Sequence, residues 1–455
     1  MKKFFTYPVF VILFLSFIGM MGFGAIVKYN YDGGEKYQFL QKPIIFISSF
    51  PKNLKKILEH GSLDLNSLPK LKKHKKKNEI NFYKNSSRNA LLVLPRYLHD
   101  LQRPVVDIID LNNFKIIHTY KHDIQQMNNL VKNKKKFPTI QIDNQPKRFE
   151  YWHSLILNDG SLIADGGTNS PLFKINFCSN LVWINDQEIF HHSKIFDHKD
   201  NIWVGGRNLY DKSSYSEVVS KYKLPNKFIE DTIINITEDG EIIKKISVLK
   251  LLIQNSILPK NFVQNAYYKH RDLDPTHLND IEPALQDTKY WLKGDVFLSL
   301  RGLSSIIHYR PETNEVVNYI TGPFSMQHDV DIISDSKLSI FNNNNYRSDN
   351  DHSEIIIYDF KTKQFQKYMD IQLKKNNFKT ELQGLSYIFK DGSLLVEEQE
   401  NGRIILFDSK GEKEWEFINK DKNGDIGNIN WSRVIEDELF IEKFKLMVKN
   451  KKCLD

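Results

Sequence analysis

Cysteine is scarce in this chain: Cys178 and Cys453 are the only two among 455 residues. Two cysteines are too few for a disulfide framework, and no C-x-x-C pair is present to form a zinc knuckle. One disulfide between them can form outside the cytoplasm, and the sequence does not decide whether it does. The disulfide-rich and zinc-finger classes of protein are therefore excluded.

Nucleotide-binding signals are also absent, since the chain has no Walker loop and no clustered Asp residues for magnesium. The formal net charge is +8, but much of the lysine excess lies in two local runs, at 70–77 and 132–136. Such runs are typical of solvated segments, and no base-reading motif accompanies them. We therefore expect no nucleotide cofactor and no nucleic-acid partner.

One long apolar run is present, from Phe4 to Val27, and it follows two lysines. At about 1.5 Å per residue a helix of this length crosses a bilayer core of about 30 Å. The lysines place the N-terminus in the cytoplasm and the rest of the chain in the periplasm or elsewhere outside the cytoplasm. A cleaved signal peptide is the alternative, but the run exceeds a usual signal core. We favour an uncleaved signal-anchor over residues 1–27.

Residues 28–88 are rich in Lys, Asn and Gly, and we interpret them as a linker or stalk. From residue 89 onward, short β-rich segments with period-two alternation are separated by turns such as NDG and KDG. They group into six units, which begin near Asn89, Trp152, His191, His277, Gln327 and Leu382.

Six four-stranded units predict an all-β fold, a six-bladed β-propeller over residues 89–455, because ring closure removes exposed sheet edges. A transmembrane helix precedes it in this interpretation. The segment from Asn430 is expected to supply an inner strand pair that completes the first blade. Short helical insertions are expected at 210–224 and 250–273, where the spacing between units is longest.

A histidine recurs at the same phase of four units, as His153, His192, His277 and His328. Equivalent positions of a circular array converge on its axis, so these residues are expected to form a partial ring. A lone histidine at a strand end is more often structural. Four histidines in phase indicate a functional site.

Other polar residues are expected beside this ring. Asn279 lies two residues after His277 and therefore on the same strand face, while Arg301 lies on the hairpin partner strand. Arg207 has the matching place one unit earlier. With no carboxylate expected nearby, this set suits a tetrahedral oxyanion, as in phosphoryl or sulfuryl transfer, with a neutral imidazole as nucleophile. Imidazoles on one axis could alternatively bind zinc or copper, although the charge of Arg301 disfavours it.

The run HLND, then Arg301 in VFLSLR, then QHDV, resembles the arylsulfotransferase family over about residues 150 to 440. Members are bacterial six-bladed propellers that move a sulfuryl group between phenols without the nucleotide donor PAPS. The resemblance implies that His328 is the nucleophile and becomes a transient sulfohistidine. It also implies that His277, Asn279 and Arg301 hold the sulfuryl oxygens and that His192 assists the phenolic oxygen.

The partners that the resemblance implies are an aryl sulfate donor and a phenolic or other hydroxyl acceptor, with no cofactor and no metal. The alternative function is a non-catalytic, membrane-anchored propeller that binds a ligand or a protein, because a fold does not by itself determine an activity.

Overall fold

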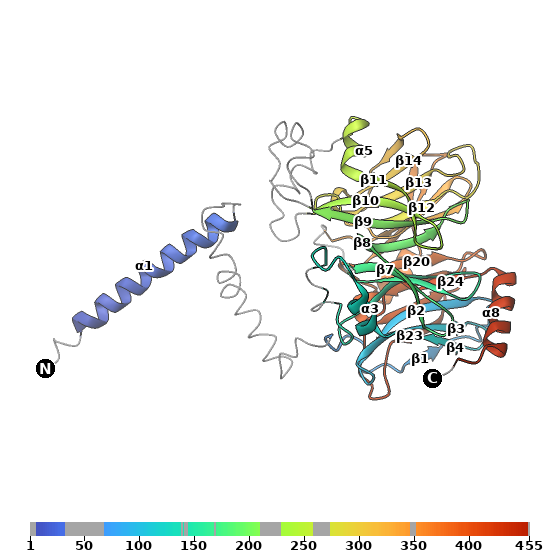
Figure 1. Ribbon diagram of the computed structural model, residues 1–455, viewed down its shortest axis with the longest axis horizontal. Helices are drawn as coiled ribbons and strands as arrows, with labels where there is room; N and C mark the ends of the chain where they lie inside the picture. The colour runs from blue at the N-terminus through green and yellow to red at the C-terminus, as the bar shows by residue number, and fades with distance from the viewer. Residues whose placement is uncertain are drawn as a thin grey trace.

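The computed structural model describes residues 6–31, 68–137, 140, 144–167, 170–209, 229–257, 274–345 and 352–453. Its first element is the helix α1 (Thr6–Tyr31). Within it, Val9–Tyr29 is long and apolar enough to cross a membrane, and none of it is buried in the protein. Signal sequences have the same length and composition. The remainder is an all-β, propeller-like arrangement with a few short helices (Figure 1).

The described strands form five antiparallel sheets, three of which have four strands. The first is β24 (Arg433–Ile435), β2 (Leu91–Leu98), β3 (Arg103–Asp110) and β4 (Lys115–Tyr120). The second is β12 (Leu278–Pro283), β13 (Val296–Leu300), β14 (Ser305–Arg310) and β15 (Glu315–Ile320). The third is β16 (Val330–Ser334), β17 (Lys337–Asn342), β18 (Glu354–Asp359) and β19 (Gln364–Tyr368).

The fourth sheet has seven strands. In order these are β5 (Tyr151–Ile156), β6 (Leu162–Gly166), β7 (Ser170–Ile175), β8 (Leu181–Phe196), β9 (Ile202–Leu209), β10 (Ile229–Ile236) and β11 (Ile242–Ser247). The 16-residue strand β8 pairs with β7 through its first half and with β9 through its second. The expectation of six separate four-stranded sheets is wrong here, because β8 runs from one unit into the next without a turn.

The fifth sheet contains β20 (Leu385–Ile388), β21 (Leu394–Glu398), β22 (Arg403–Phe407) and β23 (Lys413–Ile418), with β1 (Ile80–Phe82) added at its edge. Residues 68–88, placed in the linker on sequence grounds, therefore include a strand that extends this sheet. Lys73 pairs with the buried Glu398, and Lys77 pairs with the buried Glu416 at 2.5 Å. These contacts hold the basic run against the sheet.

The C-terminal segment closes the first sheet, because β24 pairs with β2. The prediction that the segment from Asn430 joins the first blade is confirmed, but the expected second strand is wrong. The helix α8 (Glu438–Asn450) follows instead, and the side chain of Asp437 accepts a hydrogen bond from the backbone N–H of Phe440. Ile441 and Phe444 are buried, three residues apart on one helix face, which is a helical rather than a strand period.

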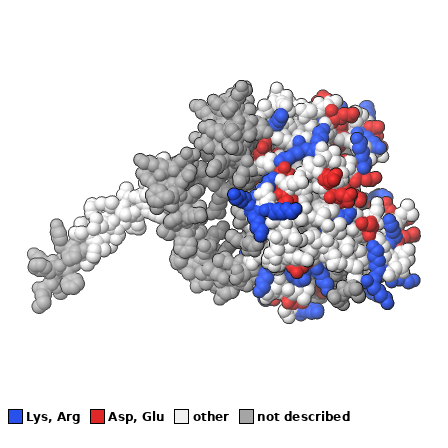
Figure 2. Space-filling model, in the orientation of Figure 1, with Lys and Arg blue, Asp and Glu red and all other residues white. Residues whose placement is uncertain are grey.

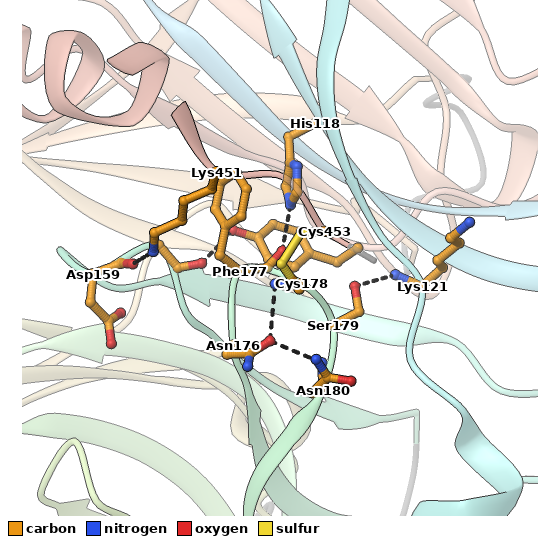
Figure 3. Close-up of a disulfide and its surroundings, with 12 residues drawn as sticks. His118, Lys121, Asp159, Asn176, Phe177, Cys178, Ser179, Asn180, Lys451 and Cys453 are labelled. Carbon is orange, nitrogen blue, oxygen red and sulfur yellow. Dashed lines mark hydrogen bonds between the residues drawn. A yellow bond between two sulfur atoms is a disulfide. The ribbon is translucent and has the colours of Figure 1, made fainter. Parts of the chain in front are cut away.

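Cys178, in the turn between β7 and β8, forms a disulfide with Cys453 after α8 (Figure 3). The two Cα atoms are 5.3 Å apart and 275 residues separate them in sequence. Nearby, Lys451 donates to the backbone carbonyl of Asp159 at 3.2 Å. The end of the chain is thus fastened to the β5–β8 part of the structure.

Short helices lie between the strands along the chain. They are α3 (Ile124–Leu130), α5 (Val248–Gln254) and α7 (Asp370–Lys375), with the 3-10 turns η3 (Arg301–Leu303) and η4 (Gln399–Asn401). α5 matches the beginning of the insertion expected at 250–273, whereas 258–273 and 210–224 lie outside the described residues. On the face seen in Figure 2, basic and acidic side chains of the described residues are interspersed.

Candidate active site at the propeller axis

The structure brings the four in-phase histidines together around Trp431. Ring-centroid distances to Trp431 are 5.2 Å from His153, 5.7 Å from His192 and 6.1 Å from His328. His277 completes the group, with its ring 5.9 Å from that of His192. His277, His328 and Trp431 lie just before innermost strands. His153 lies inside the innermost strand β5, and His192 lies where β8 becomes an innermost strand. The five rings therefore converge on the axis from five different units.

Several of these residues have an unusual backbone conformation, which sets the direction of their side chains. His153, His192, His277 and Trp431 have φ angles of 36°, 62°, 48° and 55°. Positive φ is uncommon for residues other than glycine and persists where the surroundings enforce it. Strand pairing is also irregular around His153 and His192, as in a β-bulge, which redirects a side chain out of the sheet pleat.

The sixth unit has Gly384 at this place, with φ of 138°. A Cβ atom there would lie 2.2 Å from Cε1 of Phe341 and 2.8 Å from Cγ2 of Thr380. This crowding explains why the last copy of the sequence repeat lacks a histidine.

His328 is held in one tautomer by Asn343. Its Nδ1 lies 2.7 Å from Asn343 Oδ1, and the Asn343 amide nitrogen donates to the carbonyls of Thr380 and Gln383 at 3.0 and 2.7 Å. Since Oδ1 can only accept, Nδ1 carries the proton of the neutral ring and the lone pair belongs to Nε2. Burial, and then the Arg301 guanidinium, lower the pKa of His328 well below its usual value, although Asn343 opposes this. The ring is therefore a neutral imidazole with its lone pair on Nε2.

His192 is oriented by its neighbour His191. The two Nδ1 atoms are 2.5 Å apart, while His191 Nε2 donates to the carbonyl of Gly206 at 3.1 Å and lies 3.5 Å from Asp231 Oδ1. His191 Nδ1 is then the acceptor, and His192 donates from Nδ1 and keeps its lone pair on Nε2. Burial, followed by the charges of His191 and His277, lowers the pKa of His192 well below its usual value.

His277 has a carboxylate partner that was not expected from the sequence. Its Nδ1 lies 2.9 Å from Oδ2 of the buried Asp274, and its backbone N–H donates to Oδ1 of the same residue at 3.0 Å. Arg207 Nη2 lies 3.6 Å from Asp274. Although burial opposes ionisation, the hydrogen bond and contact with His277 and the nearby Arg207 guanidinium hold the pKa of Asp274 below its ordinary value. The expectation of a cluster without nearby carboxylates is wrong, because Asp274 and Asp231 both approach it.

Arg301 and Asn279 lie in the same region. Arg301 is buried at the start of η3, where its backbone N–H donates to the carbonyl of His277 at 2.9 Å, and its charge acts on His328. Asn279 is fully buried, and its amide nitrogen donates to the carbonyl of Gln327 at 2.9 Å. One N–H of Asn279 therefore positions the residue before His328.

The sequence profile of the family described as Arylsulfotransferase (ASST) matches residues 153–420. This range is more than half of the chain, and it contains all four histidines of the cluster. The chain belongs to the arylsulfotransferase family. No curated protein sequence matches it.

Solved structures similar to this arylsulfotransferase-family chain include a protein of unknown function from Bacteroides caccae. It has 10% identity and a TM-score of 0.46, and the alignment covers 76% of this chain and 100% of that one. A functionally unknown protein from Desulfotomaculum acetoxidans has 9% identity and a TM-score of 0.37, with 76% and 79% covered. A catalytically inactive virginiamycin B lyase from Staphylococcus aureus with quinupristin has 11% identity and a TM-score of 0.33, with 59% and 69% covered.

Several site residues of this arylsulfotransferase-family chain were missed from the sequence. Asn343 belongs to a run of four asparagines and follows the second strand of its unit, as Arg301 does. Trp431 takes the place of the histidine in the first unit. Asp231 lies opposite Arg207 in the β9–β10 pair, two segments that are distant from His277 in sequence.

Asp329 links two units, and the possible metal ligands among the described residues lie outside the axial cluster. Asp329, adjacent to His328, accepts a hydrogen bond from the backbone N–H of Ser386 at 3.0 Å and so links neighbouring units. For metal binding, three ligand atoms lie within 4.8 Å of one another only at His352, Glu354 and Asp370, among the residues described. The axial histidines are not among them.

Proposed function

We propose that this chain is a PAPS-independent aryl-sulfate sulfotransferase that forms a sulfohistidine on His328. The observation that carries the proposal is the Asn343 contact, which keeps the proton of His328 on Nδ1 and leaves Nε2 as a nucleophile. The low pKa of this buried ring keeps it neutral at physiological pH. Family membership supports the substrate class, an aryl sulfate donor and a phenolic or other hydroxyl acceptor.

In the first half-reaction, the lone pair of His328 Nε2 attacks the sulfur of the aryl sulfate. The bond from sulfur to the aryl oxygen breaks, and the phenolate leaves with the bonding pair and takes a proton from solvent. The sulfurylated ring keeps its proton on Nδ1, where Asn343 Oδ1 accepts it. This hydrogen bond strengthens as the ring gains positive character, and so it stabilises the transition state.

In the second half-reaction, the acceptor oxygen attacks the same sulfur and the bond from Nε2 to sulfur breaks. The hydroxyl proton of the acceptor passes to Nε2 of His192, which its contact with His191 leaves unprotonated. Gly206 and Asp231 hold His191 in the required tautomer. His328 returns to its neutral form, and the proton on His192 returns to solvent.

The sulfuryl oxygens gain negative charge during both steps and need fixed donors. Arg301 supplies a guanidinium fork, Asn279 has a second amide N–H besides the one that holds Gln327, and His277 is oriented by Asp274. The three residues come from neighbouring segments of one sheet, β12 and η3, so one rigid unit presents them.

We further propose the finer organisation of the chain. Counting β8 in two units gives six blades, and the domain then extends from about residue 68, where the described part begins again, to the C-terminus. The disulfide between Cys178 and Cys453 supports an oxidising compartment outside the cytoplasm, with residues 1–27 as the membrane anchor.

The test uses the full-length protein in detergent, incubated with an aryl sulfate with and without a phenol. We expect mass spectrometry to find one sulfuryl group on the peptide that contains His328, and to find none in a His328→Asn variant. His198→Asn, which changes a histidine outside the axial cluster, serves as the matched control and should still form the adduct. A His328→Asn variant that transfers sulfuryl groups at the normal rate would refute the mechanism. A folded protein with neither phenol release nor adduct would favour the non-catalytic alternative.

A further inference from the structure

A cavity lies against the innermost strands, next to the histidine cluster. Its volume is about 530 Å³, and its walls include β12, β16, β20 and β24. These strands begin near the axial rings and run away from them, toward hairpin turns such as the one at Lys390 and Gly392. His153 belongs to both regions, because it contacts Trp431 and also lines the cavity. The cavity therefore adjoins the histidine cluster and opens at the opposite, hairpin end of the strands.

Four carboxylates line this cavity, namely Asp280, Glu282, Asp329 and Asp331. Asp280 and Glu282 alternate along β12, and Asp329 and Asp331 alternate across the start of β16. Part of their role is structural, since Asp280 accepts from the backbone N–H of Val330 at 3.0 Å and so links two sheets.

The charge of Arg433 acts on all four of these carboxylates, but one guanidinium cannot balance four carboxyl groups. None of the four forms an ion pair within 4.0 Å in the described part of the chain. The half-buried Arg433 also lines the cavity, but its guanidinium donates to the carbonyls of Ser154 and Lys194, at 3.4 and 2.6 Å. Lys390 at the rim is exposed, and Glu436 adds a further carboxylate. The cavity wall therefore holds more carboxyl groups than cationic groups, and an added cation would find carboxylates that form no ion pair with the protein.

Two uncharged polar side chains in the wall also lack partners. His153 is only 7% exposed, and its Nδ1 is buried without a hydrogen bond within the described structure. Ser386 is 2% exposed, and its Oγ is likewise without one. Buried polar atoms normally have partners, so unsatisfied atoms beside unpaired carboxylates point to a missing donor group.

The titration behaviour of the carboxyls agrees with this geometry. Burial raises the pKa of Asp280, and burial together with the charge of Asp280 raises the pKa of Asp331. Burial and then the charge of Asp331 raise the pKa of Glu282 well above its usual value. A cation in the cavity would favour the ionised carboxylates and release protons.

The spacing of the carboxylates distinguishes between kinds of cation. Three ligand atoms within 4.8 Å occur only at His352, Glu354 and Asp370 among the described residues, so these carboxylates do not preform a site for one metal ion. The cavity is larger than an ion, and its wall includes apolar side chains such as Ile195, Ile332 and Leu385. A flexible chain with separated ammonium groups matches both features.

We propose that this cavity binds an organic cation with two or more ammonium groups, a diamine or polyamine. Its N–H groups donate to carboxylates on β12 and β16, and its methylene groups lie against the apolar wall. The ring of Tyr387 in the same wall offers a π face to an ammonium group. This binding does not depend on sulfuryl transfer at His328.

Isothermal titration calorimetry of the full-length protein in detergent, with spermidine and with 1,4-diaminobutane, tests the proposal. We expect saturable binding with proton release, detected as a dependence of the binding enthalpy on buffer, and a higher melting temperature. Asp331→Asn and Glu282→Gln should each weaken binding at least tenfold. Asp239→Asn removes an exposed carboxylate on the β10–β11 turn and should leave binding unchanged.

Asp331→Asn is expected to fold, because Asp331 is half-buried and its removal relieves charge repulsion. A measurement on the unaltered protein gives a second test, since amine affinity should fall as pH is lowered and the carboxyls become protonated. The absence of saturable binding of either amine would overturn the proposal, as would binding that neither variant alters. Calcium that binds, displaces the amine and loses affinity in the same variants would identify a metal site instead.

Discussion

The Nδ1 atom of His328 and the Oδ1 atom of Asn343 lie 2.7 Å apart, and the Asn343 amide cannot turn without losing its bonds to Thr380 and Gln383. An imidazole fixed in this way presents the same nitrogen to every substrate. The contact distinguishes this ring from that of His153, which has no partner on Nδ1 within the described structure.

An Asn343→Leu variant should lose this control of the tautomer. We expect the rate of sulfohistidine formation to fall by about 10²-fold or more, as when a catalytic histidine loses its orienting partner. The ¹⁵N chemical shifts of His328 should also show a mixture of tautomers. Asn345→Leu, in the same asparagine run, is the control, because Asn345 donates to the carbonyl of Glu381 instead. Unchanged kinetics in Asn343→Leu would contradict the role of the contact.

The pH dependence of the reaction should reflect the low pKa of His328. A histidine whose pKa is lowered stays neutral even when the pH falls below the ordinary pKa of imidazole. The neutral, nucleophilic ring therefore persists as the solution is acidified. We expect the acid limb of kcat/KM to lie below about pH 6.5, the value of an unperturbed imidazole. Arg301→Gln removes one cause of the shift and should move that limb to higher pH. A limb at or above pH 6.5 in the unaltered enzyme would show that His328 is not the titrating nucleophile.

Two glycines allow a matched test of crowding at the axis. Gly384 and Gly424 both have positive φ, at 138° and 77°, but only Gly384 has neighbours within 4 Å of an added Cβ. Gly384→Ala should therefore lower the free energy of unfolding by about 3 kcal/mol or more, since Phe341 must move. Gly424→Ala should cost about 1 kcal/mol, from the backbone alone. Denaturant unfolding measures both values, and equal losses would argue against the clash.

The disulfide should stabilise the domain without serving the reaction. Cys178→Ser with Cys453→Ser should lower the free energy of unfolding by about 2–5 kcal/mol, because the bond restricts the unfolded chain. Sulfuryl transfer at 25 °C should remain, since Cys178 lies in the β7–β8 turn and not on an innermost strand. A reductant should lower the melting temperature of the unaltered protein and leave that of the double variant unchanged. Equal effects on both would place the stabilisation elsewhere.

Local periodicity allowed much of the fold to be predicted. Alternating apolar residues and glycine turns indicate the hairpins, and the repeat indicates units around an axis. The continuous strand β8 was missed because pairing between units depends on residues that are distant in sequence. In α8, the short apolar run at 439–441 fits a strand as well as a helix, and only the burial of Phe444 one turn later decides.

The candidate site was predictable where residues share a phase of the repeat, as the four histidines do. Asp274 is only three residues before His277, but its contact depends on a turn that the sequence pattern did not indicate. Asn343 and Asp231 were not predictable, because they reach the rings from other strands. The acidic cavity was missed for the same reason. Asp280 and Asp331 become neighbours only after two units pack side by side, and no spacing along the chain shows that.

The pairing of β24 with β2 also determines when the protein can finish folding. The first sheet lacks its innermost strand until residues 433–435 have been made, long after β2 itself. During synthesis the arrangement therefore stays an open arc, with the edge of β2 unpaired, until the strands of the later units have formed. Trp431 arrives with the same strand, so the aromatic centre of the histidine cluster is assembled after the histidines around it. Closure of the first sheet and completion of the candidate site are thus one folding event.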